Sequence, residues 1–169
     1  KARKEYAYKM SLWKQNMKLH FRQSGEIKND TIDYAIDLGT TDSVISYYNN
    51  GNPVIIKNHR TGDDFTPSAV LVDETDDVEV GVSAKNAILN NAKDAVGEFK
   101  HNMGFSIPFK FEKSSRVMFP EELSAEVLKD LRVSVYDETG VNIEHAVICV
   151  PANSNPIKTV NHHLIRFQQ

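Results

Sequence analysis

The stretch YAIDLGTTDSVISYY, residues 34–48, decides the fold, because two strand-like segments flank a short turn rich in glycine and threonine. Apolar residues alternate with other residues over positions 31–37, which predicts a half-buried strand. Residues 43–48 are rich in β-branched and aromatic side chains and predict a second strand. Residues 53–57 predict a third strand, after a turn of asparagine and glycine. The segment is therefore expected to form a three-stranded meander.

Beyond the meander, the pattern predicts shorter strands, helices and one buried strand. Strands are expected at 69–72 and 78–80, helices at 83–89 (capped by Ser83) and 94–103, and a hairpin from 107–111 and 116–119. A long helix is expected from Pro120 to Gly140, with a buried stripe of Leu123, Val127, Leu128, Leu131 and Val135. Residues 144–150 are nearly all apolar, which is typical of a central strand with Cys149 buried in it. This order of elements predicts an α/β domain.

Length and composition limit the classes of protein. The 169 residues are 40% hydrophobic and 25% charged, which fits one ordinary domain with a sizeable core and excludes a disordered chain. No apolar run approaches the ~20 residues that a membrane span needs. A single cysteine cannot form an internal disulfide, so we expect a cytoplasmic protein.

Charge is distributed unevenly along the chain. Residues 1–24 carry a net charge of +6, whereas residues 25–169 carry −9, and such an acidic body argues against nucleic-acid binding. An apolar stripe with helical spacing runs through the basic segment at Tyr6, Met10, Trp13, Met17 and Phe21. Residues 1–28 are therefore predicted to be a basic amphipathic helical extension. The helix packs on its own domain or a partner protein, or it binds a membrane surface; the pattern leaves these alternatives open.

The turn between the first two predicted strands carries the chemistry. Gly39 allows close approach of a ligand to the backbone, so the N–H groups of Gly39, Thr40 and Thr41 could surround phosphate oxygens. Asp37 at the strand end could hold a hydrated Mg²⁺. A plain hairpin with polar turn residues is the alternative.

Several segments resemble the ATPase domain of the DnaK-type heat-shock protein 70 chaperones, in the actin-like ATPase superfamily. They are YAIDLGTTDSVISYYNNGNPVIIKN (34–58), TPSAVLV (66–72), VGVSAKNAILNN (80–91), FKHNMG (99–104), FPEELSAEVLKDL (119–131) and AVICVPA (146–152). The resemblance implies a ribonuclease H-like lobe I whose core comprises residues 29–64 and 119–155. Residues 65–118 would be a small inserted subdomain, and residues 156–169 remain an unassigned tail.

The same resemblance implies roles for individual residues. Gly39, Thr40 and Thr41 would cradle the phosphates of ATP or ADP, and Asp37 would organise Mg²⁺ through water. Lys100 matches the family's catalytic lysine, which acts electrostatically on the γ-phosphate; from its residue type alone it is an ordinary surface lysine. Pro151 matches a proline that relays the nucleotide state to interdomain contacts, but it could equally be a strand terminator.

The implied function is a chaperone ATPase of the stress response that couples ATP hydrolysis to the handling of unfolded client polypeptides, together with co-chaperones. The sequence departs from the family at Asp42, which adds a negative charge beside the turn, at His101, at 153–154 and near Thr159. His162 and His163 are expected in a solvated tail rather than at a metal.

The second phosphate loop and the adenine-binding segments of the family have no counterpart here. We therefore expect this chain alone to be inactive. A degenerate or truncated DnaK-like binding or regulatory module without ATPase activity is one alternative. A sugar-kinase-like or other actin-fold enzyme is another.

Overall fold

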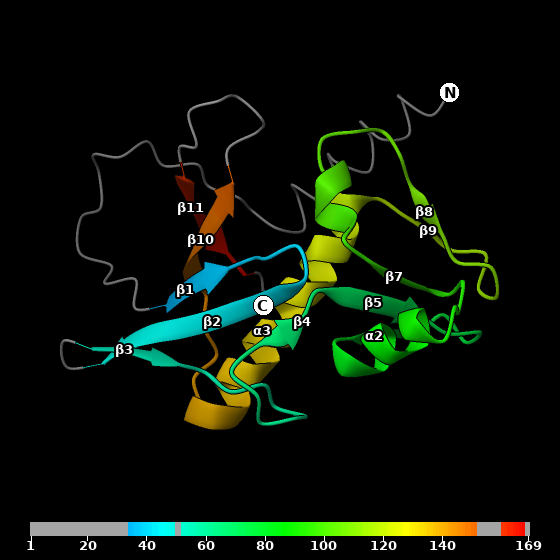
Figure 1. Cartoon of the computed structure of the whole chain (residues 1–169). Helices are drawn as coiled ribbons and strands as arrows, with labels where there is room; N and C mark the ends of the chain where they lie inside the picture. Colours follow the sequence, from blue (N-terminus) through cyan, green and yellow to red (C-terminus); the bar gives the residue numbers. More distant parts are fainter. Residues whose placement is uncertain (1–33, 50–51, 152–159, 168–169) are drawn as a thin grey trace.

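The computed structural model describes residues 34–49, 52–151 and 160–167. Over these ranges a mixed sheet, a long helix and a smaller inserted sheet pack around a shared hydrophobic core (Figure 1). The α/β class predicted from the order of elements is confirmed. The predicted helical extension over residues 1–28 lies outside the described residues. Among the helices that are described, none is long and apolar enough to cross a membrane.

The main sheet has the strand order β11-β10-β1-β2-β3, and β4 pairs with β2 beside this path. Its strands are β1 (Tyr34–Asp37), β2 (Asp42–Asn49), β3 (Asn52–Ile55), β4 (Thr66–Pro67), β10 (His145–Pro151) and β11 (Val160–Arg166). β1 runs parallel to β10, and the other pairs are antiparallel. The predicted meander is confirmed as β1, β2 and β3. Ile36 and Ile45 face each other across β1 and β2, and both are buried, so the alternation in the sequence does mark the core face.

The long helix α3 (Pro120–Thr139) crosses behind the main sheet in Figure 1 and contacts the inserted segment as well. The predicted stripe of Leu123, Val127, Leu128, Leu131 and Val135 is buried throughout. At its start, Glu122 accepts a hydrogen bond from the backbone N–H of Phe119, at 2.8 Å. Gly140 ends the helix with a φ of 71°, and its N–H donates to the carbonyl of Tyr136.

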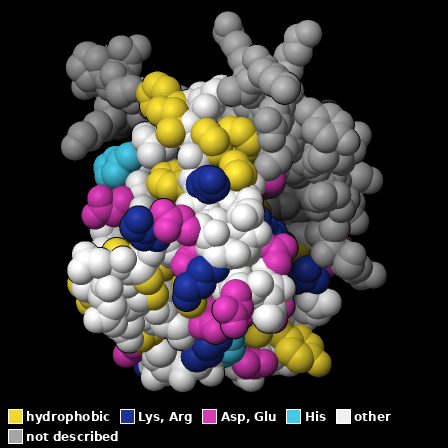
Figure 2. All heavy atoms as spheres, turned by 90° about the vertical axis from the view of Figure 1, so that its right-hand side faces the viewer, with side chains coloured by type: hydrophobic (Ala, Val, Ile, Leu, Met, Phe, Trp, Pro, Cys, Tyr) yellow, Lys and Arg dark blue, Asp and Glu magenta, His cyan; other side chains and the backbone are white. Residues whose placement is uncertain are grey.

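The inserted segment holds a second, three-stranded sheet with the order β6-β5-β7. Its elements are β5 (Ala69–Val72), β6 (Val78–Val80), α2 (Val82–Leu89), β7 (Ala95–Gly97), the 3₁₀ helix η1 (Phe99–Asn102), and the hairpin strands β8 (Phe109–Lys110) and β9 (Val117–Met118). Figure 2 shows this side of the molecule, where side chains of both charges are intermingled. Two of its ion pairs are the exposed pair Lys93–Glu112 and the pair between half-buried Arg116 and Asp76.

The prediction of a helix over residues 94–103 was wrong. Residues 95–97 instead form β7, which pairs with β5, and only a short 3₁₀ helix follows. Buried Asp94 fixes the start of this segment, because its side chain accepts a hydrogen bond from Lys113 N–H and its carbonyl accepts one from Val72 N–H. Glu98 then adopts a left-handed φ of 53°, which a continuous helix does not allow. Long-range pairing overrides the local helical pattern here.

Two smaller expectations also changed. The cap predicted at Ser83 is absent, because α2 begins at Val82 after Gly81, whose φ of 94° turns the chain and whose N–H donates to Ala69. The tail left unassigned from the sequence contains β11, which pairs with β10 from His145↔Arg166 to Pro151↔Val160. The positions of His162 and His163 therefore lie in a strand that pairs with β10.

Candidate functional site

The turn at residues 38–41 joins β1 to β2 at one edge of the main sheet (Figure 1). Leu38 is buried and anchors the start of the turn in the core. A Cβ atom at Gly39 would overlap the carbonyl oxygen of Asp42, so the backbone closes on itself here more tightly than any other residue allows. The turn is therefore a specific backbone structure that depends on this glycine.

Two buried serine hydroxyls hold the turn in place. Ser43 Oγ accepts a hydrogen bond from Gly39 N–H at 3.2 Å, and Ser68 Oγ donates to the Gly39 carbonyl at 2.9 Å. The two hydroxyls bond each other at 2.8 Å, and both side chains are buried. Ser68 N–H also donates to the Thr41 carbonyl at 2.8 Å. We call Gly39, Ser43 and Ser68 the serine clamp.

The sequence analysis missed the serine clamp. Ser43 and Ser68 are 25 residues apart, and they meet because β4 pairs with the start of β2, with Ser43 opposite Thr66. The one available signal was a small hydroxyl residue at a position of β2 that shares the buried face of Ile45. Nothing in the local pattern linked that residue to the Thr-Pro-Ser segment.

The clamp changes which backbone groups can bind a ligand. Gly39 N–H was expected to be a phosphate donor, but it donates to Ser43 instead. The N–H groups of Thr40 and Thr41 have no acceptor among the described residues. Thr41 is exposed and Thr40 is half-buried, so neither residue of this fixed turn is enclosed in the core. Such adjacent donors are suited to an anion.

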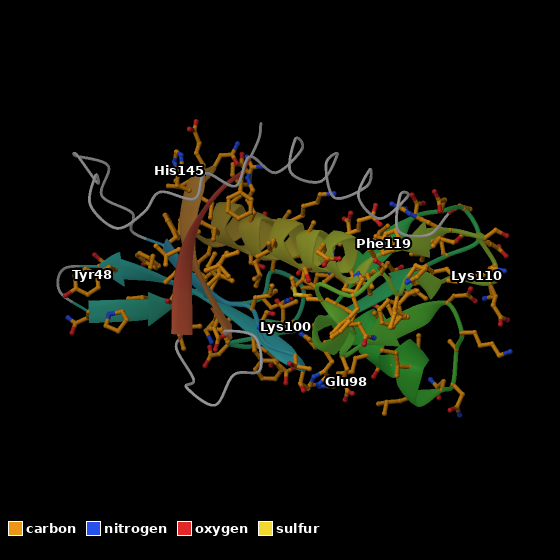
Figure 3. All side chains as sticks on the ribbon, turned by 90° about the horizontal axis from the view of Figure 1, so that it is seen from above. Tyr48, Glu98, Lys100, Lys110, Phe119 and His145 are labelled. Atoms are coloured by element: carbon orange, nitrogen blue, oxygen red, sulfur yellow. The ribbon has the colours of Figure 1, made fainter. Side chains whose placement is uncertain are left out.

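Lys100 lies in η1 of the inserted segment, on the side of that segment nearer the main sheet (Figure 3). The preceding Phe99 is buried and fixes this short helix against the core. After η1, Gly104 N–H donates to Glu121 Oε1 at 2.9 Å, which fastens the end of the segment to the first turn of α3. Lys100 is thus held in place by long-range contacts rather than by a regular helix.

The structure brings Asp37 and Lys100 into electrostatic contact. Burial lowers the pKa of Lys100 below its ordinary value, and the Asp37 carboxylate opposes that shift by charge attraction. Asp37 is itself exposed, at the end of β1. An exposed carboxylate at the start of the turn therefore lies within electrostatic reach of a half-buried cation.

These residues fit a nucleotide phosphate with a hydrated Mg²⁺. The tight turn at Gly39 keeps side-chain atoms away from the backbone donors, and Lys100 supplies a positive charge nearby. Across the described ranges, no three His, Cys, Asp or Glu side chains form a metal cluster. Mg²⁺ that keeps most of its waters needs only one or two carboxylates, so Asp37 is sufficient for that mode of binding.

Two further positions from the sequence analysis lie at this edge. Pro151 ends β10, and because β10 is parallel to β1, with Cys149 opposite Asp37, the strand ends on the same side as the turn. The side chain of Asp42 meets Lys85 of α2, with Asp42 Oδ1 and Lys85 Nζ 3.5 Å apart. The departing residues at 153–154 and Thr159 lie outside the described part of the chain.

A second polar cluster, formed by His59, Arg60, Asp130 and Ser134, ties the loop after β3 to α3. Arg60 lies 2.9 Å from the buried Asp130 carboxylate, and His59 Nδ1 lies 3.1 Å from Ser134 Oγ. Burial raises the pKa of Asp130 above its ordinary value, while the charges of Arg60 and His59 oppose this shift. Asp130 Oδ2 has no hydrogen-bond partner within the described ranges. We call these four residues the Asp130 cluster.

Comparison with known proteins supports the resemblance. The family model described as "Hsp70 protein" matches residues 34–158. The chaperone protein DnaK of Mycoplasmopsis agalactiae is 40% identical over 117 residues, which cover 69% of this chain and 19% of that protein. The chain thus spans about a fifth of the length of this curated relative.

Proposed function

The chain belongs to the Hsp70 protein family, and from that premise we propose that it is part of a DnaK-like chaperone ATPase. It binds the phosphates of Mg·ATP at residues 37–41 and contributes to coupling ATP hydrolysis to the handling of client polypeptides. The observation that carries the proposal is the fixed turn, in which Thr40 and Thr41 N–H have no acceptor among the described residues, while Asp37 at its start interacts electrostatically with Lys100.

Each residue of the site has a distinct role in this proposal. Thr40 and Thr41 N–H donate to phosphate oxygens, and the clamp orients them before the ligand arrives, so that little ordering is needed on binding. Asp37 holds the water shell of Mg²⁺, and the bound ion would neutralise phosphate charge. Lys100 is the catalytic residue, because its fixed cation stabilises the charge that redistributes over the phosphoryl oxygens.

The half-buried position of Lys100 supports its role. A cation in a partly dehydrated environment interacts more strongly with a nearby anion than a cation in bulk water does. The lowered pKa of Lys100 shows that the protein already bears part of the cost of dehydrating the ammonium group. A bound phosphate would then compensate that cost.

The wider setting of the ATPase follows from the family. Client polypeptides and co-chaperones are proposed as partners of the full-length protein, and the cytoplasm as its location. Pro151 is proposed to relay the nucleotide state, since its strand ends beside the turn.

A test of the function uses Lys100→Ala in the full-length protein, with Lys110→Ala as the matched control. Lys110 is an exposed lysine of β8, well away from Lys100 in Figure 3. Loss of a preorganised charge from a transition-state site typically lowers the rate by about 10²-fold or more. We expect that loss in the steady-state ATPase rate for Lys100→Ala and a change of less than about twofold for the control. Equal rates in the two variants would contradict the role of Lys100.

A regulatory module without ATPase activity is the second candidate, and Asp42 is the observation that favours it. A negative charge next to the turn opposes phosphate binding unless a cation compensates it. Calorimetry with Mg·ATP separates the two candidates, because a regulatory module would show no nucleotide binding. Membership of the Hsp70 family argues against the sugar-kinase-like alternative.

A further inference from the structure

Asp42 introduces a negative charge at a sensitive position. It is the first residue of β2, directly after Thr41, and its carbonyl oxygen is the atom that leaves no room for a Cβ at Gly39. Its backbone cannot move away without opening the turn. Its side chain is partly exposed, at 36%, and a carboxylate at this position repels a phosphate bound at Thr40 and Thr41.

Lys85 brings a positive charge to the same position from a different part of the chain. It lies on α2, and its Nζ is 3.5 Å from Asp42 Oδ1. Packing and a backbone hydrogen bond fix the placement of α2. Ala84 is fully buried, and Gly81 N–H donates to the carbonyl of Ala69 at the start of β5. α2 also contacts β4, the strand that pairs with β2 beside Asp42. The two charges therefore meet because of the fold, and not only because two flexible surface side chains happen to approach.

We infer that Lys85 is a binding residue for the terminal phosphates of the nucleotide, and that Asp42 and Lys85 together set the affinity of the turn for that ligand. The inference deepens the proposed function and rests on it. In the free protein Lys85 cancels the charge of Asp42. The side chain of Lys85 is 44% exposed, so its ammonium group can share its hydrogen bonds between Asp42 and an incoming phosphate oxygen.

Removing the charge of Asp42 and removing that of Lys85 should change the affinity for the phosphate in opposite directions. Removing the charge of Asp42 frees Lys85 for the phosphate and removes a repulsion, so binding becomes tighter. Removing the charge of Lys85 leaves Asp42 uncompensated beside the ligand, so binding becomes weaker. Removing both charges restores an affinity close to that of the unchanged protein.

The experiment measures the dissociation constant of Mg·ATP by calorimetry on the full-length protein carrying Asp42→Asn, Lys85→Met or both. We expect binding about threefold tighter for Asp42→Asn, about tenfold weaker for Lys85→Met, and within about threefold of the unchanged protein for the double variant. Lys85→Arg should retain most of the affinity, because it keeps the charge. Circular dichroism verifies that each variant is folded.

A matched control comes from the exposed pair Lys93–Glu112, whose charges lie 3.3 Å apart on the same inserted segment. Lys93→Met and Glu112→Gln should leave the dissociation constant within twofold of that of the unchanged protein. If Lys85→Met and Asp42→Asn behave like this control while the unchanged protein binds Mg·ATP, the inference alone is overturned. If the unchanged protein does not bind Mg·ATP, the proposed function is overturned and the inference falls with it.

Discussion

The two segments that form the candidate site are held in different ways. The turn at 38–41 is fixed by hydrogen bonds of the serine clamp, all between uncharged, mutually satisfied groups that are buried or partly buried. η1 is fixed by the packing of Phe99 and by attachment to α3, and it holds a charged side chain in a half-buried place. The first arrangement makes binding groups rigid and adds to stability. The second keeps a reactive charge in position and reduces stability.

The largest effect is expected from Gly39→Ala, which breaks the turn directly. The new Cβ would overlap Asp42 O, so the backbone has to shift, and we expect the free energy of unfolding to fall by about 3 kcal/mol. Chemical denaturation measures this change. Gly62→Ala is the control. Its φ of 75° strains an alanine, but no atom lies near the added Cβ, so we expect the free energy of unfolding to fall by only about 1 kcal/mol. Equal losses in the two variants would mean that the turn tolerates displacement.

A smaller loss is expected from Ser68→Ala, which removes one member of the clamp. Buried Ser43 Oγ and the partly buried Gly39 carbonyl each lose a partner, and about 1–3 kcal/mol of stability should be lost. Ser43→Ala should lower the free energy of unfolding less in the Ser68→Ala background than in the unchanged protein, because both hydroxyls hold the same turn. Ser83→Ala is a suitable control, since Ser83 is exposed and makes no cap bond; it should change stability by less than about 0.5 kcal/mol. Strictly additive losses at Ser43 and Ser68 would argue against a single clamp.

Lys100→Met tests whether the half-buried charge in η1 reduces the stability of the folded protein. Because burial lowers the pKa of Lys100, the charged form destabilises the folded state below that pKa, and the unchanged protein becomes relatively more stable as the pH rises toward 10.5. We expect Lys100→Met to be the more stable protein at pH 7, with an advantage that shrinks in alkaline solution. Thermal unfolding across this pH range provides the measurement, with Lys110→Met of exposed β8 as the control. A variant that is less stable at pH 7 would show that packing of the lysine stem outweighs the buried charge.

The smallest effect on stability is expected from Asp130→Asn in α3. This variant tests whether a buried charge outside η1 also reduces stability. Burial raises the pKa of Asp130, so the folded state holds this proton more firmly than the unfolded chain does. The unchanged protein therefore loses stability relative to the variant as the pH rises above 3.8, the ordinary value for this group. Unfolding experiments from acid to neutral pH would show the difference, with exposed Asp137→Asn of the same helix as control. A constant difference between the unchanged protein and Asp130→Asn would contradict this assignment.

Much of the fold could be predicted from the sequence because its signals are local. Alternation over β1 and β2, and the stripe on α3, record burial within a single element. β7 and β11 were missed because their strand character comes from pairing with β5 and β10, which the local pattern does not show. The 94–103 segment even has a helical pattern, but pairing of β7 with β5, the hydrogen bonds of Asp94 and the left-handed φ of Glu98 replace the helix.

In the candidate site too, only the residues with a local sequence signal could be predicted. Gly39 could be identified because a glycine in a short turn between two strands has few explanations. Ser43, Ser68 and Lys85 could not be placed, because their roles depend on β4 lying against β2 and α2 lying against β4. The sequence also led to an overestimate of the free donors, since one backbone N–H of the turn is already bonded to Ser43.

The parallel pairing of β1 and β10 has a consequence for how the chain acquires its structure. Ala35 pairs with Val147, so the strand before the turn obtains this neighbour only after most of the described chain has been synthesised. A ribosome adding about 5–20 residues per second needs several seconds to cover that separation. Until then one edge of β1 has exposed backbone hydrogen-bonding groups, and closing so long a loop is slow compared with forming a hairpin. A nascent chain of this protein therefore passes through a stage in which it could itself bind a chaperone.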